Sequence, residues 1–140
     1  MRHAIVCLDD EIIIVEAMRQ ELRERFGKRF LYETALSADE ARDVLSGLVE
    51  DGITVILIIS DWLMPGMKGD EFLAEVRARY PGLNAIMVTG QADEDAIERV
   101  LSEGLACRIV RKPWKADELT RAVESCLGER DAARGCGDGA

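Results

Sequence analysis

Two kinds of hydrophobic pattern alternate along the chain. Short runs of apolar residues predict strands, and longer stretches with apolar residues three and four positions apart predict helices that bury one face. The clearest helical stretch is residues 12–26, in which the apolar positions are Val15, Met18, Leu22 and Phe26. Residues 54–60 (TVILIIS) are apolar almost throughout, so we expect this strand at the centre of a sheet with both faces covered.

Strand and helix alternate five times in this pattern. The predicted strands are residues 4–8, 30–36, 54–60, 84–89 and 107–111. The predicted helices are residues 12–26, 37–49, about 70–80, 93–103 and about 116–127. Ser37 and Glu40 form a capping box at the start of the second helix. The alternation implies right-handed crossovers, and therefore an α/β fold with a doubly wound five-stranded parallel sheet.

Length and composition fit one globular domain. A chain of 140 residues, 48% hydrophobic and 32% charged, can bury a core without additional cross-links. We assign residues 1–127 to this domain. Residues 128–140 are small, polar and rich in glycine, so we expect a flexible tail or linker there.

Charge and cysteine content limit the partners and the compartment. The net charge of −9 leaves no basic stripe for phosphates, which argues against direct nucleic-acid binding by this domain. No apolar run approaches the length of a membrane span. The cysteines show no C-x-x-C spacing, and we expect Cys7, Cys107 and Cys126 to be free thiols that pack as small hydrophobic side chains. A reduced, cytoplasmic compartment is therefore expected.

Polar and charged side chains stand where four of the predicted strands end. They are Asp9 and Asp10 after the first strand, Asp61 after the third, Thr89 at the end of the fourth, and Lys112 after the fifth. The carboxyl ends of parallel strands meet at one edge of an open sheet, which is where ligands bind in such folds. We therefore expect these five side chains to converge on one site.

This set of side chains suits phosphoryl chemistry on a carboxylate. Crowded carboxylates repel one another, which favours a bound cation. Carboxylate oxygens completed by water are ligands that Mg²⁺ prefers. Aspartate is an established covalent acceptor of phosphoryl groups, and Lys112 together with a metal would offset the charge on the phosphoryl oxygens. Thr89 would donate a hydrogen bond to the same oxygens.

Four segments around these residues form a recognisable set. They are residues 8–11 (LDDE), 60–73 (SDWLMPGMKGDEFL), 87–93 (MVTGQAD) and 110–114 (VRKPW). In this order and spacing they resemble the CheY-like receiver domain of two-component response regulators, over residues 4 to about 127. The resemblance implies a flavodoxin-like fold of five strand-helix units. It also implies a Mg²⁺-dependent switch that is phosphorylated by a histidine kinase.

The resemblance assigns a role to each residue of the site. Asp61 would be the phosphoacceptor. Asp10 and Asp61 would bind Mg²⁺ directly, together with the backbone carbonyl of Leu63, while Asp9 would act mainly through water. Thr89 would be the switch hydroxyl that moves toward the phosphoryl group.

Further positions bear on how the signal is held and transmitted. Lys112 would pair with the phosphate and with Asp61, and the Lys112–Pro113 bond is expected to be cis. Receivers commonly have Tyr or Phe three residues before this lysine as a relay, whereas this chain has Ile109. Transmission to the surface is therefore expected to be weakened or to use another element. Two positions that tune phosphoryl lifetime in the family are Leu63 and Gln91 here, and we predict modest autodephosphorylation because Leu63 cannot orient water.

The resemblance also implies partners. A sensor histidine kinase or phosphotransfer protein would supply the phosphoryl group, and an output domain or separate effector would respond to it. Homodimerisation would use the surface of the fourth helix, fifth strand and fifth helix. Residues 64–69 and 112–114 are similar to those of receivers that precede transcription-activator or cyclic-nucleotide-signalling output domains.

Two other functions remain open. The first is a receiver fold that serves as a phosphorylation-independent interaction module, which Ile109 leaves open although the five pocket residues are present. The second is a haloacid-dehalogenase-like phosphatase, which also uses a strand-end aspartate and Mg²⁺. That class needs a second aspartate two residues after the nucleophile, where this chain has Leu63. A signalling domain is therefore favoured over an enzyme.

Overall fold

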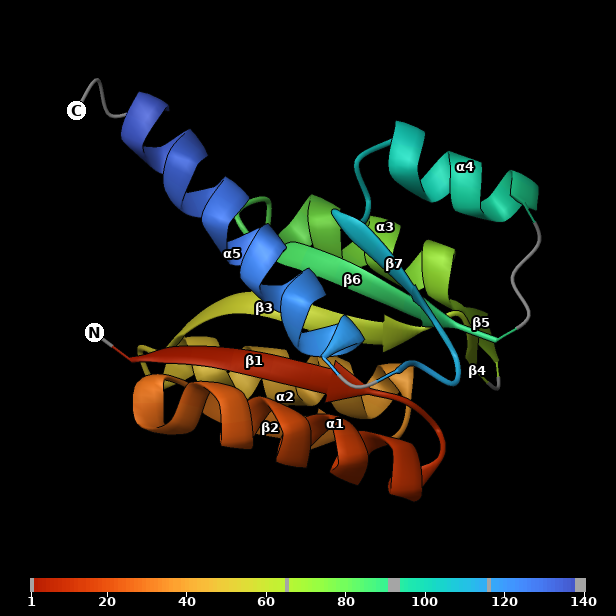
Figure 1. Ribbon diagram of the computed structural model, residues 1–140, viewed down its shortest axis with the longest axis horizontal. Coiled ribbons are helices and arrows are strands. Elements are labelled where there is room, and N and C mark those ends of the chain that lie inside the picture. The colour runs from red at the N-terminus through yellow and green to blue at the C-terminus, as the bar shows by residue number, and fades with distance from the viewer. Residues whose placement is uncertain (1, 65, 91–93, 116, 138–140) are drawn as a thin grey trace.

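Five parallel strands form one sheet in the order β2-β1-β3-β6-β7 (Figure 1). The computed structural model describes residues 2–64, 66–90, 94–115 and 117–137, and the side chains of Leu63 and of residues 129–137 lie outside this description. The strands are β1 (His3–Leu8), β2 (Leu31–Ala35), β3 (Thr54–Asp61), β6 (Asn84–Thr89) and β7 (Arg108–Arg111). The predicted parallel sheet is confirmed, since each neighbouring pair of strands is parallel.

Helices cover both faces of this sheet (Figure 1). They are α1 (Ile12–Phe26), α2 (Ala38–Glu50), α3 (Gly69–Arg79), α4 (Glu94–Ser102) and α5 (Glu118–Gly137), with a short 3₁₀ helix η1 (Gly27–Arg29) after α1. Helices α1 and α5 pack on one face, and α2, α3 and α4 pack on the other. Alternate side chains of β1 divide between the two cores. Ala4, Val6 and Leu8 lie beneath α2, whereas Ile5 and Cys7 lie beneath α1 and α5.

Strand β3 occupies the centre of the sheet, as its apolar sequence predicts. It pairs with β1 on one side and β6 on the other, and the residues from Ile56 to Asp61 are buried. The order of strands reverses between β1 and β3, and the crevice at the carboxyl ends of these strands is the expected ligand site. The predicted helix cap is also present, because Ser37 Oγ accepts a hydrogen bond from the Glu40 N–H at 3.1 Å.

Two parts of the chain differ from the sequence prediction. Helix α5 continues to Gly137, so the predicted end at about Leu127 was wrong. The helix continues through Gly128 because residues 129–134 (ERDAAR) are mostly good helix formers, and the next glycines, Gly135 and Gly137, come only at its end. Two short antiparallel strands, β4 (Leu63–Met64) and β5 (Met67–Lys68), were not predicted, because two-residue strands leave no hydrophobic period. Within the described chain, no helix is long and apolar enough to cross a membrane.

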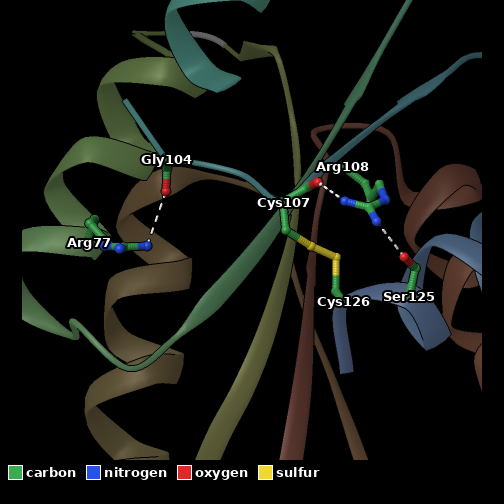
Figure 2. The surroundings of a disulfide bond; sticks show 6 residues. All are labelled: Arg77, Gly104, Cys107, Arg108, Ser125 and Cys126. Atoms are coloured by element: carbon green, nitrogen blue, oxygen red, sulfur yellow. Dashed lines mark hydrogen bonds between the residues drawn. A yellow bond between two sulfur atoms is a disulfide. The ribbon is translucent and has the colours of Figure 1, made fainter. Parts of the chain in front are cut away.

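The expectation of free thiols was wrong for two cysteines. Cys107 and Cys126 form a disulfide with their Cα atoms 6.1 Å apart, between the start of β7 and helix α5 (Figure 2). That Cα separation is ordinary for a disulfide. The spacing of the cysteines along the chain could not predict this disulfide, because the distance between Cys107 and Cys126 depends on how α5 packs on the sheet. Cys7 is free and fully buried in β1, as expected.

Candidate functional site

Lys112 lies between two buried carboxylates at the carboxyl edge of the sheet. Its Nζ donates to Asp9 Oδ2 at 2.7 Å and lies 3.1 Å from Asp61 Oδ1. Asp9 is 0% exposed and Asp61 is 5% exposed. One ammonium therefore compensates part of the negative charge of two carboxylates, which come from the ends of β1 and β3.

Backbone hydrogen bonds extend the sheet by one residue beyond the strand ends and fix these side chains. The Asp9 N–H donates to the Ala35 carbonyl at 3.2 Å, the Trp62 N–H to Val88 at 2.9 Å, and the Lys112 N–H to Thr89 at 2.8 Å. The backbone of these residues is thus held by the central sheet. The Lys112–Pro113 bond is cis, as predicted.

Asp9 and Asp10 differ in their surroundings although they are adjacent in sequence. Asp9 Oδ1 accepts the Glu11 N–H at 2.9 Å at the start of α1, so both of its oxygens are engaged. Asp10 is exposed at the mouth of the site. Asp9, Asp10 and Asp61 each place one carboxylate oxygen within 4.8 Å of the other two. Three hard oxygen donors in this arrangement fit a Mg²⁺ ion that keeps part of its water shell.

The electrostatics of the site leave negative charge uncompensated. Burial raises the pKa of the Asp61 carboxyl, and the neighbouring Asp9 raises it further, while Lys112 acts in the opposite direction. Burial disfavours the Lys112 ammonium, but hydrogen bonds and charge from Asp9 and Asp61 outweigh it, so the pKa of Lys112 is raised. The lysine therefore stays charged at neutral pH, and the pocket favours an additional cation.

The other predicted site positions lie at different distances from the acidic cluster along the chain and in the sheet. Thr89 ends β6 and is 1% exposed, and its carbonyl accepts the Lys112 N–H, so it belongs to the same edge. Ile109 lies on β7 opposite Met87, half-buried against the core that includes α4. The backbone of Leu63 pairs with Lys68 in the small hairpin directly after Asp61. Gln91 lies outside the described residues.

Gly69 is a site residue that the sequence analysis did not identify. Its N–H donates to the Trp62 carbonyl at 2.6 Å, and a Cβ built there would lie 2.8 Å from the Trp62 Cα and closer still to the Asp61 carbonyl. Only glycine therefore lets α3 begin directly against the backbone of Asp61 and Trp62. The chain offered only a glycine after a turn, and nothing in that pattern indicates a contact with Asp61.

A second unpredicted feature links α3 to α4. Asp70 is 6% exposed, and its Oδ2 accepts a hydrogen bond from Arg99 Nη1 at 2.9 Å. Its Oδ1 is buried and has no partner among the described residues. A carboxylate in the first turn of a helix is usually exposed, so the burial of Asp70 and its ion pair with Arg99 could not be expected from the sequence.

Comparison with known proteins identifies the family. A family model described as the response regulator receiver domain matches residues 5–124. The chain belongs to this family. Receiver domains are signalling domains rather than classical enzymes, and membership argues against the phosphatase alternative.

Curated relatives of this receiver domain include two transcriptional regulators. It is 37% identical over 123 residues to the hydrogenase transcriptional regulatory protein HoxA of Cupriavidus necator, covering 88% of this chain and 24% of the relative. It is 34% identical over 127 residues to the C4-dicarboxylate transport transcriptional regulatory protein DctD of Rhizobium meliloti, covering 91% and 26%. The chain thus spans about a quarter of the length of these relatives.

Solved structures agree on the fold. The signal receiver domain of an HD domain-containing protein from Pseudomonas fluorescens superposes with a TM-score of 0.81 at 27% identity, covering 94% of this chain and 99% of that one. A response regulator receiver domain protein from Clostridium thermocellum gives 0.79 at 26% identity, covering 94% and 98%. The predicted CheY-like receiver fold is confirmed.

Proposed function

We propose that this receiver domain accepts a phosphoryl group on Asp61 from a sensor histidine kinase or phosphotransfer protein. The observation that carries the proposal is the carboxylate of Asp61 at the end of the central strand, beside two further carboxylates and 3.1 Å from the Lys112 ammonium. An oxygen of Asp61 attacks phosphorus, and the bond from phosphorus to the donor's histidine nitrogen breaks. The product is an aspartyl phosphate.

The contacts of the Asp61 carboxylate suit the role of a nucleophile better than that of a buried structural acid. Lys112 contacts its Oδ1, which leaves the other oxygen as the nucleophile. Lys112 also remains charged beside the new phosphoryl group, where its ammonium offsets negative charge on the phosphoryl oxygens. Thr89, at the same sheet edge, donates its hydroxyl hydrogen to one of those oxygens.

The acidic cluster is proposed to hold Mg²⁺. Asp10 and Asp61 would be direct ligands with the backbone carbonyl of Leu63, and Asp9 would act through water, because both Asp9 oxygens already accept hydrogen bonds. When bound, the metal supplies positive charge that lets the carboxylates and the incoming phosphoryl group approach one another. Autophosphorylation from small phosphodonors and autodephosphorylation are the only reactions that we propose for the chain itself.

The output side of the switch is proposed from the family and from surface position. An output domain or a separate effector would respond to changes in α4, β7 and α5, and homodimerisation would use the same surface. We propose no direct nucleic-acid contact by this domain, given its net charge of −9. A cytoplasmic location follows from the proposed kinase partner.

A phosphorylation-independent interaction module remains the second candidate. The observation that favours it is Ile109, a half-buried aliphatic residue where family members commonly have an aromatic relay. In that case the surface of α4, β7 and α5 would bind its partner equally well with or without a phosphoryl group.

The test is incubation with acetyl phosphate and Mg²⁺, followed by intact-protein mass measurement. We expect the natural chain to gain the mass of one phosphoryl group and Asp61→Asn to gain none. Asp70→Asn is the matched control, because Asp70 is also buried but lies outside the acidic cluster, and it should still be modified. A natural chain that gains no mass with Mg²⁺ would favour the interaction module.

A further inference from the structure

The Cys107–Cys126 pair joins two elements at the far end of the sheet from the acidic site. Cys107 directly precedes β7, whereas Lys112 directly follows it, so the two sites lie at opposite ends of this strand. Cys126 is fully buried in α5, and Cys107 is half-buried, so the pair can be approached from the side of Cys107. Figure 2 shows the sulfurs bridging the strand and the helix.

The backbone around Cys107 is fixed independently of the sulfur bridge. The Cys107 N–H donates to the Ala85 carbonyl at 2.8 Å, which attaches it to β6. Arg77 Nη1 donates to the Gly104 carbonyl at 3.0 Å, which holds the preceding loop to α3 (Figure 2). These contacts do not involve the sulfur, so Cys107 keeps its place when the bridge is open.

Arg108 holds the two cysteine-bearing segments together by a second connection. Its Nη1 donates to the Cys107 carbonyl and its Nη2 to Ser125 Oγ, each at 2.6 Å (Figure 2). The guanidinium thus contacts Cys107, directly before β7, and Ser125, the neighbour of Cys126 on α5. Two thiols held in this way stay within reach of each other.

We propose that Cys107 and Cys126 form a reversible thiol–disulfide modification site that governs how firmly α5 is anchored to β7. The proposal rests on the proposed function and its cytoplasmic location, because intracellular disulfides are usually transient and redox-responsive. Both states fit the same core, since a free thiol packs as a small hydrophobic side chain. The reaction partner is a low-molecular-weight thiol and its disulfide, such as glutathione.

The exchange balances in two steps. The Cys107 thiolate attacks one sulfur of glutathione disulfide and releases one glutathione thiolate, which takes up a proton. The Cys126 thiol then loses its proton and attacks the Cys107 sulfur of this mixed disulfide, which releases the second glutathione. The protein sulfurs lose two electrons in total, and glutathione disulfide is reduced to two thiols. Reduced glutathione opens the Cys107–Cys126 disulfide by the same two steps in reverse.

Cys7 provides an internal control for this chemistry. It is fully buried in β1, and burial raises the pKa of its thiol to about 12. It therefore has almost no thiolate at neutral pH and should not exchange while the protein is folded. The fourth cysteine of the sequence, Cys136, is replaced by serine in the test, so that redox chemistry of the folded domain is confined to the pair.

The test is a redox titration of the Cys136→Ser chain in glutathione buffers, with acid quenching, alkylation and intact-mass measurement. We expect one conversion between a disulfide and two alkylated thiols within the range of ratios that glutathione buffers, with Cys7 unmodified throughout. A disulfide that persists in reduced glutathione alone would overturn the proposal, because the bridge would then be permanent. A disulfide that never forms in oxidised glutathione would overturn it as well.

A second measurement separates this site from the phosphoryl site. Amide hydrogen exchange in α5 should be on the order of ten- to a hundredfold faster in the reduced chain, while acetyl phosphate uptake should be the same in both states. Unchanged exchange in α5 would show that the bridge does not anchor the helix. Neither the redox titration nor amide hydrogen exchange requires phosphorylation. A failure of the proposed phosphoryl function would therefore be seen only in the acetyl phosphate measurement.

Discussion

At the acidic site, the burial of a single carboxylate costs stability. Asp61 is buried beside Asp9, with one ammonium compensating both carboxylates. Burial is the largest cause that raises the pKa of Asp61 in the folded chain, and the charge of Asp9 is the next. The folded state therefore binds this proton more tightly than the unfolded state does. In the absence of a bound cation, ionisation of Asp61 therefore costs more free energy in the folded chain than in the unfolded chain.

The Asp61→Asn variant should accordingly be more stable than the natural chain at neutral pH without metal. As pH rises from the ordinary value of 3.8 through the raised pKa of Asp61, the natural chain loses stability that the variant keeps. We expect Tm to be about 2–4 °C higher for the variant at pH 7 in a chelator, and equal at about pH 3. A lower Tm for the variant at pH 7 would mean that the attraction to Lys112 outweighs burial.

The residue two positions after Asp61 should set the lifetime of the phosphoryl group. Leu63 is apolar and cannot orient a water molecule for attack, so we expect an aspartyl phosphate half-life of minutes or longer. Leu63→Asn supplies a polar group and should shorten the half-life by about tenfold or more. Leu63→Met is the control and should leave the half-life unchanged. A half-life of seconds in the natural chain, measured by phosphate release, would contradict this prediction.

At the scale of elements, the site depends on how closely α3 approaches the end of β3. Gly69 begins α3 directly against the backbone of Asp61 and Trp62. A methyl group there would push the helix or the Asp61 segment aside. Buried backbone cannot yield as the end of a flexible side chain does.

Gly69→Ala should therefore destabilise the protein and impair the site together. We expect a loss of about 1–3 kcal/mol in urea unfolding and a clear fall in acetyl phosphate uptake. Gly47→Ala in α2 is the matched control, because nothing in the described chain beyond the neighbouring residues and backbone of α2 lies within 4 Å of the added Cβ. Alanine there should stabilise the helix by about 0.5–1 kcal/mol. Equal effects of the two substitutions would refute the close-contact explanation.

Helix α4 is held to α3 through the buried Asp70. Arg99 donates to Asp70 Oδ2, and the other carboxylate oxygen is buried without a partner in the described part of the chain. Arg99→Met would leave the buried Asp70 carboxylate without its cation, so we expect the variant to unfold at a lower urea concentration than the natural chain. The double variant with Asp70→Leu should recover most of this loss. If it is instead as unstable as the two losses added, the pair does not interact.

For the whole molecule, the sequence predicts the sheet and the site because both follow from short-range patterns. Five apolar runs alternate with helical periods, and the residues that follow them, such as Asp61 and Lys112, share one sheet edge by topology alone. Contacts that depend on how elements pack were not predictable in this way. The Cys107–Cys126 bridge, the approach of Gly69 and the burial of Asp70 each need the position of a helix on the sheet. The length of α5 was missed because glycines near its end outweighed the helix formers before them.

The domain spans about a quarter of the length of the transcriptional regulators that it resembles. Under the proposed function, one phosphorylation event changes the surface of the domain. The residue that takes the phosphoryl group is therefore the central claim to test. Asp9, Asp10 and Asp61 lie within one cluster, and intact mass alone does not distinguish among them.

The most direct test is to locate the modified residue. The natural chain would be phosphorylated with acetyl phosphate and Mg²⁺, the acyl phosphate reduced with borohydride to homoserine, and the product mapped by peptide mass spectrometry. We predict homoserine at position 61 and unchanged aspartate at positions 9 and 10, with no homoserine when Mg²⁺ is omitted. Homoserine at another position, or none in the presence of Mg²⁺, would contradict Asp61 as the phosphoacceptor.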